Sequence, residues 1–284
     1  MTVFYIILAI CIIAIVLLIL INISNNCLKI TKYKVKNSKL PDNFNNMKIV
    51  HISDVHSKTF GKNNEEFIKK VKKINPDIII MSGDIIDDST KDVDSSITSL
   101  KEIYSNYPTF YSIGNHERKL GYKPYKKYIE LLRDNGVNVL VNEGVYFKKG
   151  KEEIKINALK FRENMQPKIL TEEKKEKYIK YMKNKLKDIN VNEFNILIAH
   201  DPENFELYEK LGVDLIFSGH IHGGLIRVGK VCLLSPRRKL FPKYSYGKYK
   251  LNNTTLITSS GIGKASIPIR LFNRPEIVEV ILNK

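Results

Sequence analysis

Short apolar runs rich in isoleucine and valine recur along this chain, and five of them end in clusters of Gly, Asp, Asn and His. The five runs are Lys48–Ile52, Asp77–Met81, Thr109–Ile113, Phe194–Ile198 and Leu215–Phe217. Such runs predict strands that are buried on both faces of a sheet. Segments with helical spacing alternate with strand-like runs, at Asn63–Ile74, Ser95–Tyr107, Tyr125–Asn135 and Thr171–Ile189. This alternation predicts a layered α/β domain.

All six histidines lie at or beside the ends of predicted strands. The clusters are Asp54-Val55-His56, Gly83-Asp84-Ile85-Ile86-Asp87, Gly114-Asn115-His116-Glu117, Ala199-His200-Asp201 and Gly219-His220-Ile221-His222. A spacing of two places both side chains on one side of an extended segment, which pairs Asp54 with His56 and His220 with His222. Because catalytic residues concentrate in loops, we expect these strand-end clusters to meet in one site.

The chemistry of these side chains indicates a site for two metal ions. Carboxylates and imidazoles suit Mn, Fe or Zn, and the clusters contain no thiolate that would favour a softer metal. A carboxylate can join two cations, and we expect Asp84 to be that bridge. Two metal ions about 3.5–4 Å apart activate a bridging hydroxide and stabilise an in-line displacement at phosphorus. The glycines of the clusters are expected to let the backbone turn sharply near the ions.

Each cluster taken alone also has an ordinary explanation. A single Asp-x-His occurs by chance, a Gly-Asn pair favours a turn, and Gly-His-x-His is also compatible with a satisfied strand end. The argument for a site therefore depends on all five clusters occurring together, each at the end of a predicted strand.

In this order the five motifs resemble the calcineurin-like metallophosphoesterase superfamily. The resemblance implies an α/β fold in which helices flank a two-sheet β-sandwich. It assigns Asp54, His56 and His222 to the first metal, Asn115, His200 and His220 to the second, and Asp84 to the bridge. It also implies that His116 stabilises the phosphoryl group or protonates the leaving oxygen, and that Asp87 orients His116. Arg118 is a further candidate contact for phosphate, because arginine forks match phosphate oxygens.

Other segments are similar to one branch of the superfamily, the YaeI/YkuE-type phosphodiesterases, which often carry an N-terminal membrane or export segment. These segments are His51–Asp54, Leu240–Tyr244, Ile267–Arg270 and Pro275–Val278. The segment Leu159–Asn164 departs from the family pattern, because it lacks the Gly-Asp type of turn. Since the departure lies beside the expected site, it bears mainly on the choice of substrate.

The N-terminus contains an unbroken apolar run, Val3–Ile21. As a helix it would span roughly 28 Å, which is close to the hydrocarbon thickness of a bilayer. A cleaved signal peptide is the main alternative, but no Lys or Arg precedes the run and no A-x-A site follows it. We therefore expect a single-pass transmembrane anchor over residues 1–23, a juxtamembrane linker over 24–46 and the phosphoesterase domain over 47–284.

The distribution of charge gives an expected orientation in the cell membrane. The span has no basic residue before it, whereas Lys29, Lys32, Lys34 and Lys36 follow it. The positive-inside rule then places the catalytic domain on the cytoplasmic face. The net charge of +17 is explained by lysines spread over solvated surfaces, and no dense basic run indicates nucleic acid as a partner.

These features predict an enzyme whose two divalent ions (Mn, Fe or Zn) hydrolyse phosphate esters through a metal-bridging hydroxide. The favoured reaction is that of a phosphodiesterase or pyrophosphatase acting on a membrane-associated, lipid-linked substrate. The resemblance points to a lipid of the UDP-2,3-diacylglucosamine type. A phosphomonoesterase acting on proteins or nucleotides, and a non-catalytic scaffold that binds metal, are the alternatives.

Overall fold

Two mixed β-sheets lie face to face in the computed structural model, which describes residues 1–90, 92–162, 171–236, 238–264, 267 and 269–284. Within these residues, the strands of the first sheet are, in spatial order, β1 (Lys29–Lys36), β14 (Glu276–Asn283), β2 (Lys48–Ile52), β3 (Ile78–Met81), β4 (Thr109–Ser112) and β5 (Val137–Leu140). Those of the second are β12 (Gly247–Leu251), β13 (Thr254–Thr258), β9 (Leu215–Ser218), β8 (Asn195–Ala199), β7 (Glu152–Leu159) and β6 (Glu143–Lys149). The predicted two-sheet sandwich is confirmed.

The sheets bury an apolar layer between them. The first sheet contributes Ile49, Ile80 and Phe110, and the second contributes Ile156 and Phe217. Strands β2 to β5 run parallel, as do β7, β8, β9 and β13. Because both faces of the central strands are covered, their sequences are almost continuously apolar, as expected for buried parallel strands.

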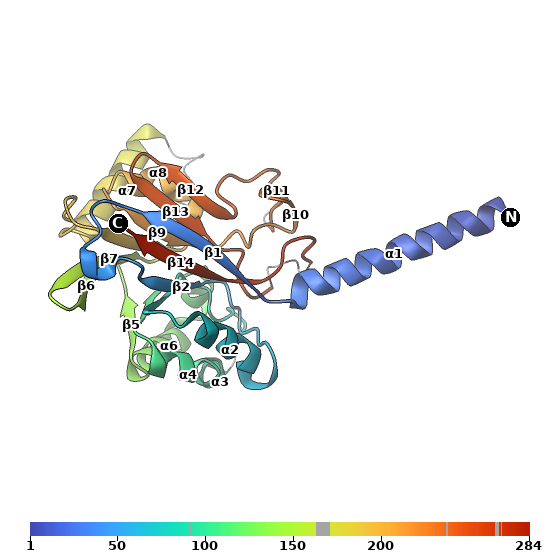
Figure 1. The fold of residues 1–284 in the computed structure, drawn as a ribbon, viewed down its shortest axis with the longest axis horizontal. Helices are drawn as coiled ribbons and strands as arrows, with labels where there is room; N and C mark the ends of the chain where they lie inside the picture. The colour runs from blue at the N-terminus through green and yellow to red at the C-terminus, as the bar shows by residue number, and fades with distance from the viewer. Residues whose placement is uncertain (91, 163–170, 237, 265–266, 268) are drawn as a thin grey trace.

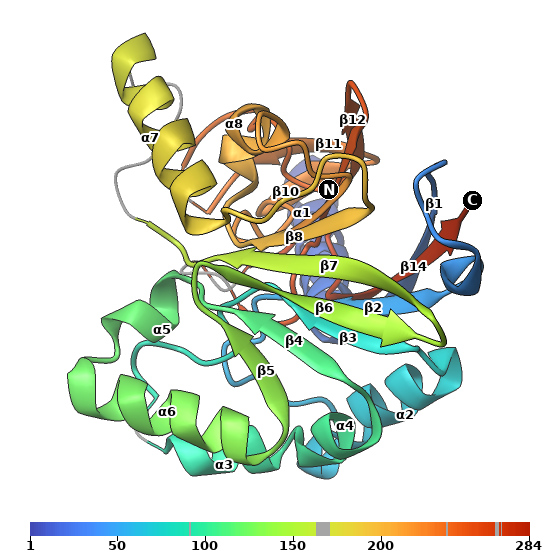
Figure 2. The same ribbon diagram turned by 90° about the vertical axis from the view of Figure 1, so that its left-hand side faces the viewer.

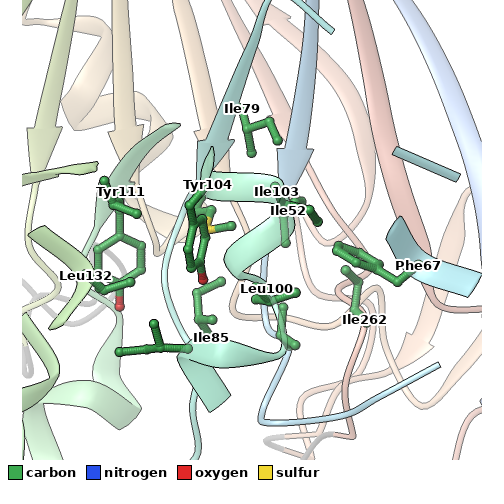
Figure 3. Packing of buried hydrophobic residues seen from close by; sticks show 14 of the residues in the cluster. Ile52, Phe67, Ile79, Ile85, Leu100, Ile103, Tyr104, Tyr111, Leu132 and Ile262 are labelled. Atoms are coloured by element: carbon green, nitrogen blue, oxygen red, sulfur yellow. The ribbon is translucent and has the colours of Figure 1, made fainter. Parts of the chain in front are cut away.

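Helices cover the outer faces of both sheets (Figure 2). On the first sheet lie α2 (Glu65–Ile74), α3 (Val93–Thr98), α4 (Lys101–Asn106) and α6 (Tyr122–Asp134). On the second lie α7 (Glu172–Lys185) and α8 (Phe205–Glu209). Figure 3 shows the first of these layers, in which Phe67, Leu100, Ile103 and Leu132 pack towards Ile79 of the sheet.

Shorter elements connect the layers. They are α5 (Asn115–Lys119), the hairpin of β10 (Ile226–Val228) and β11 (Val231–Leu234), and three 3-10 turns at Asp42–Phe44, Lys62–Asn64 and Pro202–Asn204. The helix expected over Ser95–Tyr107 is interrupted between α3 and α4. There the Ser99 hydroxyl donates to the carbonyl of Ser96 at 2.8 Å, which offers the backbone an alternative to a continuous helix.

Helix α1 (Thr2–Asn26) projects away from the domain (Figure 1). Its most apolar window has a mean hydropathy of 3.5 and is 0% buried, so the helix is long and apolar enough to cross a bilayer. The anchor expected over residues 1–23 therefore falls within one continuous helix.

The segment expected to be a linker, residues 24–46, contains strand β1, and this part of the prediction is wrong. Strand β1 pairs in parallel with β14 from Lys29 to Lys36. Val35 is buried between the sheets, while Lys32, Lys34 and Lys36 are exposed. Lysines on an edge strand discourage pairing with other chains, and here they give a true strand the composition of a polar connector.

We expect Val35→Asp to lower the free energy of unfolding by about 3 kcal/mol or more, because it buries a charge without a partner. Lys34→Asp is the matched control on the exposed face and should change stability by less than about 0.5 kcal/mol. Chemical denaturation of the full chain in detergent measures both. Equal stability of the two variants would mean that the segment is a free linker after all.

Candidate metal centre

The five predicted clusters lie at one edge of the sandwich, where both sheets end their parallel strands. Strands β2, β3 and β4 lead into the first three clusters, and β8 and β9 lead into the last two. Because the carboxyl ends of parallel strands share one edge of each sheet, residues far apart in the sequence meet there. Among the described residues they form three groups with the geometry to hold a cation: Asp54 with His56 and His222; Asp84 with His200 and His220; and His56 with Asp87 and His116.

The first group brings two imidazoles and a carboxylate together. The Nε2 atoms of His56 and His222 are 3.3 Å apart, and the rings stack at 19°. His222 Nε2 also lies 3.5 Å from Asp54 Oδ1. Burial lowers the pKa of both histidines, so each ring favours the neutral form that binds metal. A divalent cation bound here would receive lone pairs from three side chains.

In the second group, a backbone carbonyl orients the ring of His200 towards Asp84. His200 Nδ1 lies 2.8 Å from the Ser82 carbonyl oxygen, which can only accept, so Nδ1 carries the proton. Nε2 then faces Asp84 Oδ2 at 3.1 Å. Either a proton on Nε2 or a metal cation beside both atoms makes this buried contact favourable. Burial opposes the charged ring, but Asp84 and Asp54 outweigh it and raise the pKa of His200 to about 10.

Asp84 belongs to the second group and also lies close to the first. Its Oδ2 atom lies 3.1 Å from His200 Nε2 and 3.9 Å from His56 Nε2. Its Oδ1 atom accepts the backbone N–H of His116 at 2.9 Å, which fixes the orientation of the carboxylate. The geometry therefore fits the bridging position proposed for Asp84 in the sequence.

Asn115 also fits a metal site. It is the first residue of α5, and its Oδ1 atom is buried with no hydrogen-bond partner among the described residues. Leaving such an acceptor unsatisfied costs about 1–3 kcal/mol, so a cation would relieve it. The chemistry of the donor set, with carboxylates, imidazoles and an amide oxygen, suits Mn, Fe or Zn.

His116 stands at the exposed side of the groups, with a quarter of its side chain accessible. Its Nδ1 atom is 3.6 Å from Asp87 Oδ1 and 3.5 Å from Asp88 Oδ1. Its ring meets that of His56 edge-on, with centroids 4.6 Å apart. The arrangement places Asp87 where it can orient His116, and it adds Asp88, which the sequence pattern had not singled out.

The backbone of the ligand loops is not extended, contrary to the expectation for the paired spacings. Five of the seven predicted metal ligands have a positive φ: Asp54, His56, Asp84, His220 and His222. Side chains rarely adopt this left-handed conformation, which costs about 1–3 kcal/mol at each position and persists only where the surroundings impose it. Left-handed residues therefore turn each pair of ligands inward.

At Gly114 and Gly219, which were expected to let the backbone turn sharply near the ions, the structure shows close packing between ligand loops. A Cβ atom on Gly219 would lie 2.1 Å from Asp54 Oδ2, and one on Gly114 would lie 2.2 Å from Asp84 Oδ1. In place of the Gly219 side chain, both oxygens of Asp54 accept the N–H of His220 at 3.0 Å.

Glu117 is a residue that sequence reasoning missed. Its carboxylate is fully buried and accepts backbone N–H groups from Asp84, Gly114 and Ile85 at 2.7–3.0 Å. Burial and the charge of Asp84 raise its pKa to about 7. The signal was its place in Gly-Asn-His-Glu, a motif in which only Asn115 and His116 had been given roles. Glu117 holds the β3 and β4 loops together.

Arg270 was also missed as a site residue. It is buried, and its Nη2 atom donates to the carbonyl of Gly263 at 2.7 Å and lies 3.5 Å from His222 Nδ1. Its Nη1 atom is buried and has no hydrogen-bond partner within the described parts of the chain. A guanidinium with a spare donor beside a metal ligand can meet a phosphate oxygen.

Arg118 does not join the three groups. It is exposed, and its Nη1 atom donates to the carbonyl of Phe161 at 2.9 Å. The Phe161 ring contacts the rings of His200 and His220, with centroids 5.9 and 5.0 Å away. Arg118 therefore supports the wall of the site, and its contact with substrate stays a prediction.

We expect Glu117→Gln to lower the free energy of unfolding by about 1–3 kcal/mol, because an amide cannot accept all of these backbone hydrogen bonds. Activity should fall with it, since the Asp84 backbone loses its support. Exposed Glu130 on α6 provides the control Glu130→Gln. Denaturation and ester hydrolysis measured on both variants test this role, which would be wrong if Glu117→Gln matched the control.

Comparison with known proteins gives an independent view of the same residues. The family model for calcineurin-like phosphoesterases matches residues 47–224. The chain is 32% identical over 266 residues to an uncharacterised metallophosphoesterase of Campylobacter jejuni, covering 91% of this chain and 64% of that protein. It is 27% identical over 255 residues to the metallophosphoesterase YkuE of Bacillus subtilis, covering 87% and 82%.

A relative in Bos taurus bears on membrane association. It is a transmembrane protein with a metallophosphoesterase domain, 25% identical over 272 residues, with coverage of 89% of this chain and 56% of that protein. The chain thus spans less than two thirds of the Campylobacter and Bos taurus relatives. Together with α1, the relative indicates membrane association. Since the family model matches more than half of the chain, the chain belongs to the calcineurin-like phosphoesterase family.

Proposed function

We propose that this protein is a phosphodiesterase or pyrophosphatase that uses two divalent metal ions on a lipid-linked substrate. The observation that carries the metal part of the proposal is the position of Asp84, whose Oδ2 atom lies within 3.9 Å of histidines from both groups. Asp54, His56 and His222 would hold one ion, and Asn115, His200 and His220 the other. Bound ions of this kind supply Lewis-acid charge and an activated water for attack at phosphorus.

The residues of the chain divide the remaining work. His116 is at the exposed side of the site, so its imidazole can donate a proton to the leaving oxygen. The carboxylates of Asp87 and Asp88 lie near its Nδ1 atom and can orient the ring, which leaves Nε2 to face the substrate. Arg270 Nη1, which has no hydrogen-bond partner among the described residues, can meet a non-bridging phosphate oxygen and neutralise charge there.

We expect His116→Asn to slow hydrolysis of an alkyl phosphodiester by about 100- to 10,000-fold, because a poor leaving group needs a proton in the transition state. A nitrophenyl ester leaves without that help, so its loss should be much smaller. Rates for both esters at saturating metal test the role. An equal loss on both would show that His116 does not act as a general acid.

Arg270→Gln should lower kcat/KM by about 10- to 100-fold, since a hydrogen bond to a charged group is worth about 1.5–3 kcal/mol. Arg133→Gln, on the exposed face of α6, is the control. Metal content measured in parallel separates loss of phosphate contact from loss of the ions. An unchanged kcat/KM in a variant with full metal content would rule out the phosphate contact.

A lipid-linked substrate is supported by where the anchor joins the domain. The end of α1 contacts the domain close to the site, since Lys58, two residues after His56, hydrogen-bonds to the carbonyl of Asn25. A phosphomonoesterase acting on proteins or nucleotides is the alternative, because it would use the same metal ligands. Preference for bis-nitrophenyl over mono-nitrophenyl phosphate, in the metal-loaded full chain, favours the diesterase, and the reverse preference favours the alternative.

The side of the membrane remains part of the proposal. Lys29, Lys32, Lys34 and Lys36 favour a cytoplasmic domain by the positive-inside rule. Protease added to intact cells should leave the domain uncut, and cleavage before lysis would place it outside.

A further inference from the structure

Large apolar side chains are exposed along one strip of the domain. Beyond residues 1–26, nine such side chains are exposed among the described residues, and six of them belong to this strip. We call these six the apolar rim: Val228, Val231, Leu240, Phe241, Ile269 and Phe272. Phe241 is 66% exposed and Leu240 is 71% exposed. Soluble proteins rarely gather apolar side chains in this way unless the surface meets a partner or a membrane.

Backbone contacts make the rim one continuous surface. The N–H of Arg227 on β10 donates to the Leu271 carbonyl at 3.1 Å, and the N–H of Leu271 donates to Leu225 at 2.7 Å. Strands β10 and β11 form a hairpin, and the N–H of Phe241 donates to Leu233 of β11 at 3.2 Å. The parts of the rim therefore hold fixed positions relative to one another.

The end of the anchor helix attaches to this same surface. The N–H of Phe272 donates to the hydroxyl of Ser24 at 3.0 Å, and Arg274 Nε donates to the carbonyl of Cys27 at 2.9 Å. Ser24 and Asn25 are buried against the domain, unlike the rest of α1. Figure 1 shows β10 and β11 on the side of the domain from which α1 extends. A bilayer crossed by α1 would therefore begin beside the rim.

Positive charge accompanies the apolar surface. Lys230 lies at the exposed turn between Val228 and Val231. The Nζ atom of Lys58 donates to the carbonyl of Asn25 at the end of α1. Basic side chains around apolar ones match a bilayer interface, where headgroup phosphates lie above acyl chains.

The rim is also attached to the metal centre. Between Ile269 and Phe272 the chain carries Arg270, which lies beside His222. The next residue after Phe272, Asn273, donates to the backbone carbonyl of His222 at 2.6 Å. A surface that rests on the bilayer at the rim would hold the metal centre at a fixed, short distance from the headgroups.

We propose that the apolar rim lies in the interface of the bilayer that α1 crosses and holds the metal centre against phosphoesters in that bilayer. The occupant of the rim is lipid rather than protein, because the transmembrane helix leaves the domain at the rim itself. The inference deepens the proposed function and rests on it for the nature of the substrate. The position of the rim can be tested without any turnover.

The chain contains no tryptophan, so single Trp variants report their own surroundings. We would reconstitute full-length Phe241→Trp and Val231→Trp in phosphatidylcholine–phosphatidylglycerol vesicles, with and without lipids brominated near the headgroup end of the acyl chains. Tyr146→Trp is the control, since Tyr146 is 44% exposed on β6, at the end of the domain away from α1. In a variant that hydrolyses bis-nitrophenyl phosphate, this activity shows that the variant is folded.

Both rim variants should emit at shorter wavelength and lose about half of their fluorescence to brominated lipid, because interfacial segments reach about 5–10 Å into the bilayer. The control should do neither. No quenching at either rim position would overturn the proposal. Short-wavelength emission without quenching would also overturn it, and would place a protein surface, such as a second copy of the chain, on the rim. Val231 lies on β11 and Phe241 on a separate segment. If one variant fails to fold, the other variant still tests the proposal.

Quenching does not depend on catalysis, so the rim and the proposed reaction can fail separately. Quenching of rim fluorescence in a protein that cleaves no phosphodiester would support the position of the rim and refute the proposed reaction. Hydrolysis by a protein whose rim fluorescence is not quenched would support the proposed reaction and refute the position of the rim.

Discussion

The site depends on negative charge that is buried at one edge of the sandwich. The carboxylates of Asp54 and Asp84 are both buried, and Asp84 Oδ2 lies 3.1 Å from His200 Nε2. Buried carboxylates are unfavourable unless positive charge lies beside them, and His200 supplies only part of that charge. Two divalent cations would supply that charge and share Asp84. The rest of the fold serves to hold these atoms in place.

The two sheets and their loops hold the Asp and His side chains in position. Parallel strands from both sheets end at one edge, and left-handed backbone at Asp54, Asp84 and His220 turns the ligands inward. Glu117 then ties the β3 and β4 loops together through backbone hydrogen bonds. Strain at the ligands is thus balanced by buried hydrogen bonds and by the apolar layers on both faces of the sheets.

The sequence predicted the strands that carry the site, because buried parallel strands have an unmistakable apolar composition; β2 matches its predicted bounds. It also predicted which Asp and His residues meet, since each follows such a strand. It failed for β1, whose outward lysines resemble a connector, and for the conformation of the Asp54–His56 pair, which depends on contacts between distant loops. Arg270 escaped notice because nothing in its local pattern reveals that it reaches His222, which lies 48 residues away.

The central claim is that one carboxylate joins two metal ions. Electron paramagnetic resonance of the metal-free full chain, reloaded with two equivalents of Mn²⁺, tests it most directly. We predict the spectrum of an exchange-coupled pair, and its replacement by uncoupled Mn²⁺ signals in Asp84→Asn. Uncoupled ions in the unaltered protein, or a coupled pair that survives in Asp84→Asn, would contradict the account.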